Sequence, residues 1–205
     1  MFISCTTGQL CTATSAARQT PDTPDVALVR SIAAGDKHAM QILFARHNVR
    51  VFRFLLRLVG DKSAAEDLVS DVFLDVWRQA GRFQGRSQVT TWLLAIARNK
   101  ALSALQRRST EELDEDAVAA IEDTENNPEV MIHTRQTSAI LLNCLKQLSP
   151  PHREVIDLVY YHEKSTDEVA EITGVPQNTV KTRMFYARKR IADLMSAQGI
   201  DRAIV

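Results

Sequence analysis

Apolar residues recur every three or four positions along most of the chain, which is the spacing of amphipathic helices. The seven glycines fall mostly between these apolar runs rather than inside them. The pattern therefore predicts an all-α protein. The predicted helices cover 25–34, 39–59, 64–80 and 89–106, a stretch from Ile140 to Leu148, a stretch beginning at Pro150, and both sides of Gly174.

Polar residues at the ends of these runs predict where two of the helices begin. Ser63 is followed three residues later by Glu66, and Ser165 is followed by Glu168. A serine and a glutamate at this spacing form a capping box, in which each side chain accepts a hydrogen bond from the other residue's backbone N–H. Gly174 can adopt the left-handed conformation that ends a helix. Residues 165–190 are therefore predicted to form two helices joined by a tight turn.

The second helix of this pair has a face suited to DNA. Val180, Met184 and Ala187 recur at helical spacing and are expected to face a core. A helix-turn-helix whose second helix is basic and aromatic is typical of proteins that read duplex DNA. An ordinary helical hairpin with a charged, solvated face also fits this stretch taken alone. The positions off the apolar stripe are Lys181, Arg183, Phe185, Tyr186, Arg188 and Lys189.

An acidic segment divides the chain into two parts. Residues 109–135 are rich in aspartate and glutamate and poor in large apolar residues, which predicts an extended, flexible linker. The expected organisation is a flexible segment at 1–24, a helical domain at 25–108 and a second helical domain at 136–205. This chain length, 205 residues, allows two small domains with a core each.

The overall composition narrows the class of protein. The chain is 45% hydrophobic and 24% charged, with 25 basic and 25 acidic residues, so it lacks a uniformly basic coat. Cys5, Cys11 and Cys144 form no CxxC pair and no histidine stands at metal-ligand spacing, so no metal or cofactor is expected. No apolar run is long enough to span a membrane, and residues 1–20 make a poor signal peptide. The sequence therefore predicts a cytoplasmic protein without membrane insertion.

The end of the first domain suits single-stranded nucleic acid. Residues 83–108 combine Arg86, Arg98 and Lys100 with the ring of Trp92 and the amide of Asn99. Cations track phosphates, aromatic faces stack on unpaired bases, and an amide pairs with a base edge. The alternative is that Trp92 belongs to the core and the arginines only keep the surface soluble.

Catalytic motifs do not occur in the sequence. It contains no GxxxxGK[ST] phosphate loop, no HExxH zinc motif and no GxSxG nucleophile elbow. Paired carboxylates occur only in the acidic segment and on the polar face of the helix at 64–80, where solvation explains them. We therefore expect a protein that binds but does not catalyse.

Short motifs in both halves resemble those of the extracytoplasmic-function, or group IV, sigma factors of bacterial RNA polymerase. The resemblance covers roughly Val26 to Leu194, and its motifs follow one another in the family's order. They are DLVSDVFLDVW at 67–77, FQGRS at 83–87, TWL at 91–93, IARN at 96–99, LSP at 148–150 and NTVKTR at 178–183.

The resemblance implies three groups of site residues. The first domain of such a protein binds a coiled coil of the polymerase β′ subunit and captures a flipped base at the minus-ten promoter element, and the second reads the minus-thirty-five duplex beside the β flap. The residues implied for polymerase binding are Asp67, Leu68, Asp71, Phe73, Leu74, Asp75 and Trp77. Those implied for the minus-ten element are Phe83, Arg86, Ser87, Trp92, Arg98, Asn99 and Lys100. Those implied for the minus-thirty-five element are Asn178, Thr179, Lys181, Thr182, Arg183, Phe185, Tyr186, Arg188 and Lys189.

Three residues depart from the family's usual pattern. Asn178 replaces a glycine, Tyr186 stands where an arginine is common, and Asp75 stands where a cation is common, which puts a base contact from Asp75 in doubt. The resemblance also implies regulation by an anti-sigma factor. The main alternative is a stand-alone helix-turn-helix regulator, which has no reason to carry the block at 64–108.

Overall fold

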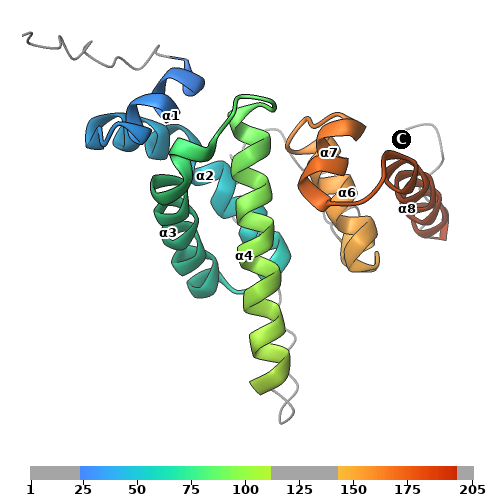
Figure 1. Cartoon of the computed structure of the whole chain (residues 1–205). Helices are drawn as coiled ribbons and strands as arrows, with labels where there is room; N and C mark the ends of the chain where they lie inside the picture. Colours follow the sequence, from blue (N-terminus) through green and yellow to red (C-terminus); the bar gives the residue numbers. More distant parts are fainter. Residues whose placement is uncertain (1–23, 112–142, 198–205) are drawn as a thin grey trace, which may run out of the picture.

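The computed structural model describes residues 24–111 and 143–197, and all regular elements in these ranges are helical (Figure 1). The prediction of an all-α fold is confirmed. The predicted linker lies mostly outside the described residues, as does the segment 1–23. The elements are α1 (Asp25–Ala33), α2 (Lys37–Val59), α3 (Lys62–Gln79), the 3-10 turn η1 (Ala80–Arg82), α4 (Val89–Glu111), α6 (Pro150–Tyr160), α7 (Thr166–Thr173) and α8 (Gln177–Ala197).

Local sequence explains where most of these helices start. The capping box at α7 is present, with the Glu168 N–H donating to Ser165 Oγ at 3.2 Å and the Ser165 N–H donating to Glu168 Oε2 at 3.0 Å. The predicted box at Ser63 is wrong, because α3 begins two residues earlier, at Lys62. Asp61 is the cap, and its Oδ1 accepts a 2.6 Å hydrogen bond from the Ala64 N–H. An aspartate in extended backbone conformation satisfies the free N–H groups of the first turn as well as a serine does.

Both halves of the chain contribute buried apolar residues to the core. In the first half Leu43, Phe54, Leu55, Leu93 and Leu94 are almost fully buried, so α1 to α4 pack around one centre. In the second half the stripe predicted for α8 meets α6 and α7. Full burial of one large apolar side chain stabilises a fold by about 1.5–3 kcal/mol. The most deeply buried apolar residues of the second half are Cys144, Val155, Leu158, Val169, Val180 and Ala187.

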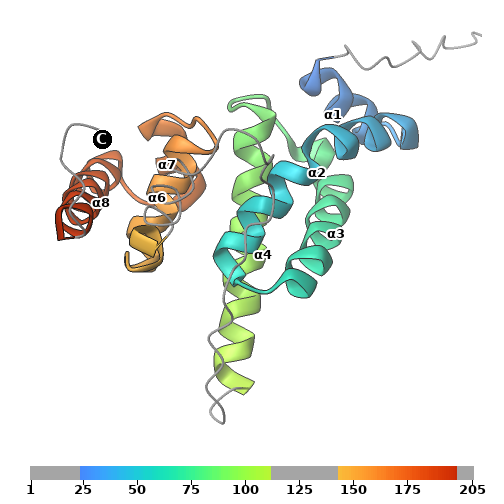
Figure 2. The ribbon, with the colours of Figure 1, turned by 180° about the vertical axis from the view of Figure 1, so that it is seen from behind.

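The two halves also lie against each other. Figures 1 and 2 show α4 between the α2–α3 pair on one side and the α6–α7 pair on the other. Contacts join α4 to α7 and α2 to α6, whereas α8 packs on α6 and α7. Helix α8 therefore lies on the side of the second domain that faces away from α4.

Candidate nucleic-acid interface

Helix α8 exposes most of the residues predicted to read duplex DNA. Val180, Met184 and Ala187 are buried against α6 and α7, as the periodicity predicted. Thr179 and Arg183 are half-buried. The opposite face therefore offers hydroxyl, cationic and aromatic groups to a ligand. The exposed residues are Asn178, Lys181, Thr182, Phe185, Tyr186, Arg188 and Lys189.

The turn before α8 holds this helix at a fixed angle to α7. Gly174 has a φ of 68°, in the left-handed region, and its N–H donates to the Ala170 carbonyl at 2.9 Å. A side chain at this φ is strained, so glycine suits the position. Pro176 follows, and its carbonyl accepts from the N–H groups of Thr179 and Val180. This is the helix-turn-helix geometry that the sequence predicts.

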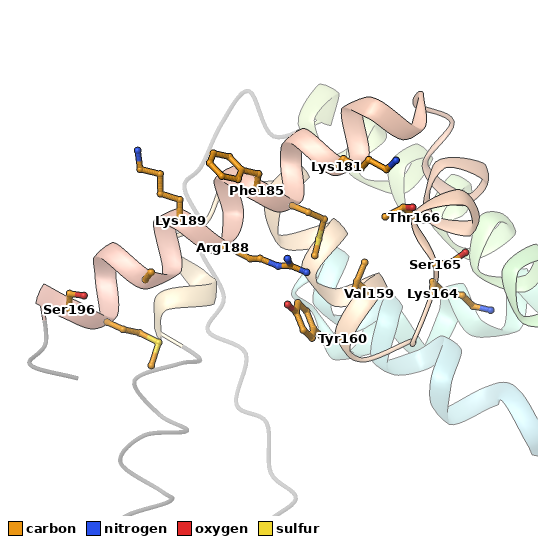
Figure 3. A pocket seen from close by; sticks show the side chains of 13 residues that line it. Val159, Tyr160, Lys164, Ser165, Thr166, Lys181, Phe185, Arg188, Lys189 and Ser196 are labelled. Carbon is orange, nitrogen blue, oxygen red and sulfur yellow. The ribbon is translucent and has the colours of Figure 1, made fainter. Parts of the chain in front are cut away.

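Beside α8 runs a groove whose lining is basic and apolar. Figure 3 shows Arg188 directed across the groove toward Tyr160 of α6, and the Arg188 Cζ lies 5.7 Å from the centre of that ring. Met184, Phe185 and Met195 contribute apolar surface. Among the described residues that line the groove there is no aspartate or glutamate.

Four of the predicted minus-ten residues cluster where η1 leads into α4. The rings of Phe83 and Trp92 lie 4.9 Å apart between centroids, and both are half-buried against the core. Trp92 therefore belongs partly to the core, as the alternative interpretation proposed, while part of its ring stays accessible. Ser87 is half-buried and Arg86 is exposed.

The other three predicted minus-ten residues lie further along α4, and two of them are ion-paired. Arg98 Nε lies 2.6 Å from Glu154 Oε1 of α6, and Lys100 Nζ lies 2.9 Å from Asp75 Oδ2 of α3. Asn99 is exposed and lines a polar hollow between α3 and α4. In this conformation two of the predicted phosphate-binding cations are therefore engaged within the protein.

Some of the residues predicted to bind polymerase are exposed, and others are partly or fully buried. Asp67, Asp71 and Leu74 are exposed on one face of α3, and 46% of Leu74 is accessible. Leu68 and Phe73 are buried, and Phe73 packs edge-on against Phe44 with centroids 4.8 Å apart. Asp75 is held in its ion pair with Lys100, and Trp77 is half-buried.

Sequence reasoning missed a polar layer between α4 and the second domain. Lys164, which is only 5% exposed, donates from Nζ to Thr90 Oγ1 at 2.6 Å, Thr91 Oγ1 at 3.0 Å and Gln88 Oε1 at 3.2 Å. The Thr91 hydroxyl donates in turn to Glu168 Oε1 at 2.6 Å. One signal was present in the sequence. Carboxylates at 154 and 157 stand among apolar residues of α6, and buried carboxylates need cationic partners.

The same polar layer lowers the pKa of the Glu168 carboxyl group. Burial of the Glu168 carboxyl raises its pKa, but hydrogen bonds from Lys164, Thr91 and the Ser165 N–H, with the charge of Lys164, outweigh burial and lower the pKa from 4.5 to about 2. Glu168 is therefore ionised at neutral pH. It caps α7 and contacts α4 at the same time.

The fold defines an all-helical protein with a helix-turn-helix, and comparisons with known proteins identify its family. The Sigma-70 region 2 profile matches residues 43–111, and the Sigma-70 region 4 profile matches residues 138–191. The chain is 32% identical over 178 residues to the RNA polymerase sigma factor CarQ of Myxococcus xanthus, covering 82% of this chain and 96% of CarQ. It is 30% identical over 182 residues to the ECF RNA polymerase sigma factor SigL of Mycobacterium tuberculosis, covering 86% of this chain and all of SigL.

The chain belongs to the extracytoplasmic-function sigma factors of the sigma-70 family. A sigma factor gives RNA polymerase its promoter specificity and has no catalytic activity of its own. The alternative of a stand-alone regulator is set aside, because region 2 precedes region 4. Below, region 2 denotes the part with α1 to α4, and region 4 denotes the part with α6 to α8.

Solved structures share the fold. The sigma factor RpoE from Bartonella quintana, solved with the anti-sigma factor NepR, superposes with a TM-score of 0.63 at 24% identity, covering 75% of this chain and 94% of that one. CnrH, solved with the cytosolic domain of CnrY, superposes with a TM-score of 0.62 at 23% identity, covering 84% of this chain and 97% of CnrH. Within residues 24–111 and 143–197, no helix is long and apolar enough to cross a membrane. The same residues hold no metal-binding cluster of histidine, cysteine and carboxylate side chains.

Proposed function

We propose that α8 reads the minus-thirty-five element of a promoter as duplex DNA. The observation that supports this is its exposed face, which carries Lys181, Arg188 and Lys189 beside two aromatic rings. Cations position the helix on phosphates, while Asn178, Thr182 and the rings reach base edges in the major groove. Because Tyr186 offers a phenol rather than a guanidinium, we expect fewer guanine contacts and more contacts with methyl and amino groups.

The region from Phe83 to Asn99 is proposed to capture the minus-ten element as a single strand. Phe83 and Trp92 form an aromatic pair on which a base can stack, and Arg86 lies exposed next to them. Asn99 offers an exposed amide about two helical turns after Trp92 in α4. Unstacking a base costs a few kcal/mol, and contacts of this kind offset that cost only at a matching sequence.

Core polymerase is proposed to bind the exposed face of α3, with region 4 beside the β flap. Asp67, Asp71 and Leu74 form an acidic face around one apolar side chain, which suits a partner surface with basic side chains around an apolar one. The family resemblance implies that this partner is the coiled coil of the β′ subunit. Leu68 and Phe73 are proposed to support this face from the core rather than to touch the partner.

Two further assignments complete the proposal. The protein is expected to act in the cytoplasm, where polymerase and promoter DNA meet. An anti-sigma factor is proposed as its regulator, because the structures with RpoE and CnrH contain such partners or are solved with a cytosolic partner domain.

Run-off transcription with purified core polymerase on a library of randomised promoters tests the proposal. We expect transcripts only when the chain is present, and we expect the selected promoters to share two elements. A chain that binds duplex DNA but neither binds core polymerase nor supports initiation contradicts the proposed function. Leu74→Ala should weaken binding to core polymerase, whereas Val49→Ala, at another exposed apolar residue, is the matched control.

A further inference from the structure

The contact between region 2 and region 4 is polar, buried and spread over several elements. Arg98 of α4 binds Glu154 through Nε at 2.6 Å and Nη2 at 3.3 Å. Arg57 of α2 donates to Asp157, and the Arg57 guanidinium lies over the ring of Tyr161 with 3.8 Å to its centroid. Glu154 and Asp157 are 7% and 6% exposed, and each meets an arginine of region 2. Within region 4, His162 Nε2 also lies 3.4 Å from Asp157 Oδ2.

Lys164 extends this contact to the start of α4. Glu163 just before it has a φ of 54°, which a residue with a side chain rarely adopts, and the Lys164 N–H donates to the Leu158 carbonyl. These features hold Lys164 inside the interface, where Thr90, Thr91 and Gln88 surround its ammonium group. The ring of His162 lies edge-on to Phe54 of α2, with centroids 5.3 Å apart.

The region 2 side of this contact overlaps the proposed minus-ten surface. Arg98 is one of the proposed cations, and Gln88, Thr90 and Thr91 lie in the chain between Ser87 and Trp92. In the observed conformation region 4 therefore occupies part of the surface that the promoter strand would need.

The contact also brings the two proposed DNA-reading surfaces too close together for one promoter. Elements near positions −10 and −35 are about 25 base pairs apart, which is ~85 Å of duplex at about 3.4 Å per base pair. Glu168 touches Thr91. From Glu168 a fully extended chain to Gln177 spans at most ~31 Å, and the helix from Gln177 to Lys189 adds ~18 Å. The chain cannot cover both elements until the two regions separate.

We propose that this contact is an autoinhibitory latch, in which region 4 holds Arg98 and the start of α4 away from promoter DNA until the two regions separate. The proposal rests on the proposed function of both surfaces. A polar layer suits a reversible contact. In the closed form the cost of desolvating the charged groups offsets much of their mutual attraction, and on opening these groups regain their water. An apolar interface of the same size would resist opening more strongly.

The latch affects the two promoter elements differently. Helix α8 lies on the far side of region 4 from α4, so its DNA-reading face stays accessible in the closed form (Figure 1). A duplex with only the minus-thirty-five element should therefore bind open and closed chains equally. Promoter complexes that need both elements should form only from the open fraction, which raises the half-saturating concentration of the chain by the reciprocal of that fraction.

Two variants of the full-length chain test the latch from region 4. Glu154 lies outside the groove beside α8, whereas Lys164 also lines that groove. Glu154→Gln weakens the pair with Arg98, and Lys164→Met removes the ammonium from the α4 contact. Glu171→Gln is the matched control, because Glu171 is an exposed glutamate of α7. Circular dichroism checks that each variant is folded. If Lys164→Met does not fold, Glu154→Gln alone tests the latch.

Two measurements are compared for each variant. Small-angle X-ray scattering should give a larger radius of gyration for both latch variants than for the wild type and Glu171→Gln. Titration of the chain into core polymerase and a promoter selected by run-off transcription should half-saturate at a concentration about three- to tenfold lower, if closed chains make up about 70–90% of the wild type. For Glu154→Gln, binding to the isolated minus-thirty-five duplex should change less than twofold.

Three outcomes separate the latch from the proposed function. Unchanged scattering and unchanged half-saturation in both latch variants overturn the latch while the sigma activity stands. Expanded variants with unchanged half-saturation also overturn it, because the closed form then does not inhibit. Failure of every variant and of the wild type to form promoter complexes overturns the proposed function, and the latch as an inhibitory device falls with it.

Discussion

Asp75 of α3 holds Lys100 of α4, with Oδ2 2.9 Å from Nζ, directly beside the exposed amide of Asn99. Arg78 adds a second, longer contact to the other oxygen at 3.8 Å. Asp75 stands where the family commonly has a cation. In this chain it therefore neutralises a positive charge close to the proposed path of the melted strand.

Asp75→Asn should free that charge for DNA. Binding of the full-length chain to a single strand with the minus-ten element should tighten, and the slope of log affinity against log salt should steepen by about 0.7, the value for one further phosphate contact on single-stranded DNA. Titrations at several salt concentrations measure both. Asp71→Asn, an exposed aspartate on the same helix, is the control. Equal slopes for the two variants would mean that Lys100 does not reach a phosphate.

The capping box of α7 should contribute measurably to the stability of region 4. Ser165→Ala removes the acceptor of the Glu168 N–H. Loss of such a cap costs about 1 kcal/mol of unfolding free energy, which urea unfolding detects as a lower midpoint. Ser196→Ala, at an exposed serine near the end of α8, should leave the midpoint unchanged. A midpoint for Ser165→Ala equal to that of the control contradicts a stabilising cap.

Glu168 should make stability depend on acidic pH. Its pKa is lowered from 4.5 to about 2, so the stabilisation is complete above pH 4.5 and is lost as the pH falls toward 2. The upper limit of this loss in unfolding free energy is about 3 kcal/mol. The actual loss should be smaller, because about a fifth of the Glu168 side chain is accessible to solvent. Urea unfolding of Glu168→Gln should show a flatter dependence between pH 5 and 2 than the wild type. Between pH 5 and 8 the unfolding free energies of the two proteins should change with pH in the same way, since Glu168 stays ionised there.

Local patterns were sufficient to predict the helices and the turn of the helix-turn-helix. The stripe of Val180, Met184 and Ala187 is buried as predicted, because helical periodicity records which face meets a core. Gly174 ends α7 in the left-handed conformation, since few other residues adopt it. The start of α3 was placed wrongly because Asp61 and Ser63 are both acceptable caps, and their spacing alone does not rank them.

The pairing of cations could not be predicted in the same way. Arg98 and Lys100 read as free charges in the sequence, yet Glu154 and Asp75 hold them. Glu154 stands 56 positions away along the chain, so only the packing of region 4 on α4 brings it to Arg98. Sequence indicates that a buried carboxylate needs a cation, whereas the tertiary fold decides which cation it meets.

Asn99→Ala should separate promoter opening from promoter recruitment. The Asn99 side chain is exposed, so its removal should change the free energy of unfolding by less than about 0.5 kcal/mol. Loss of an amide contact to a base edge should weaken capture of the minus-ten strand by about 1–3 kcal/mol. Permanganate reactivity of unpaired thymines measures opening, and binding to the minus-thirty-five duplex measures recruitment.

Asn178→Ala on α8 is the reciprocal control for this prediction, because it removes the same amide from the other surface. It should weaken duplex binding and leave the opening of already bound promoters unchanged, whereas Asn99→Ala should do the reverse. Equal losses of opening and duplex binding in Asn99→Ala would contradict a role in base capture. Such a result would instead mean that Asn99 contributes to the contact with core polymerase, since it lines a hollow shared with Asp71 of the proposed polymerase-binding helix α3.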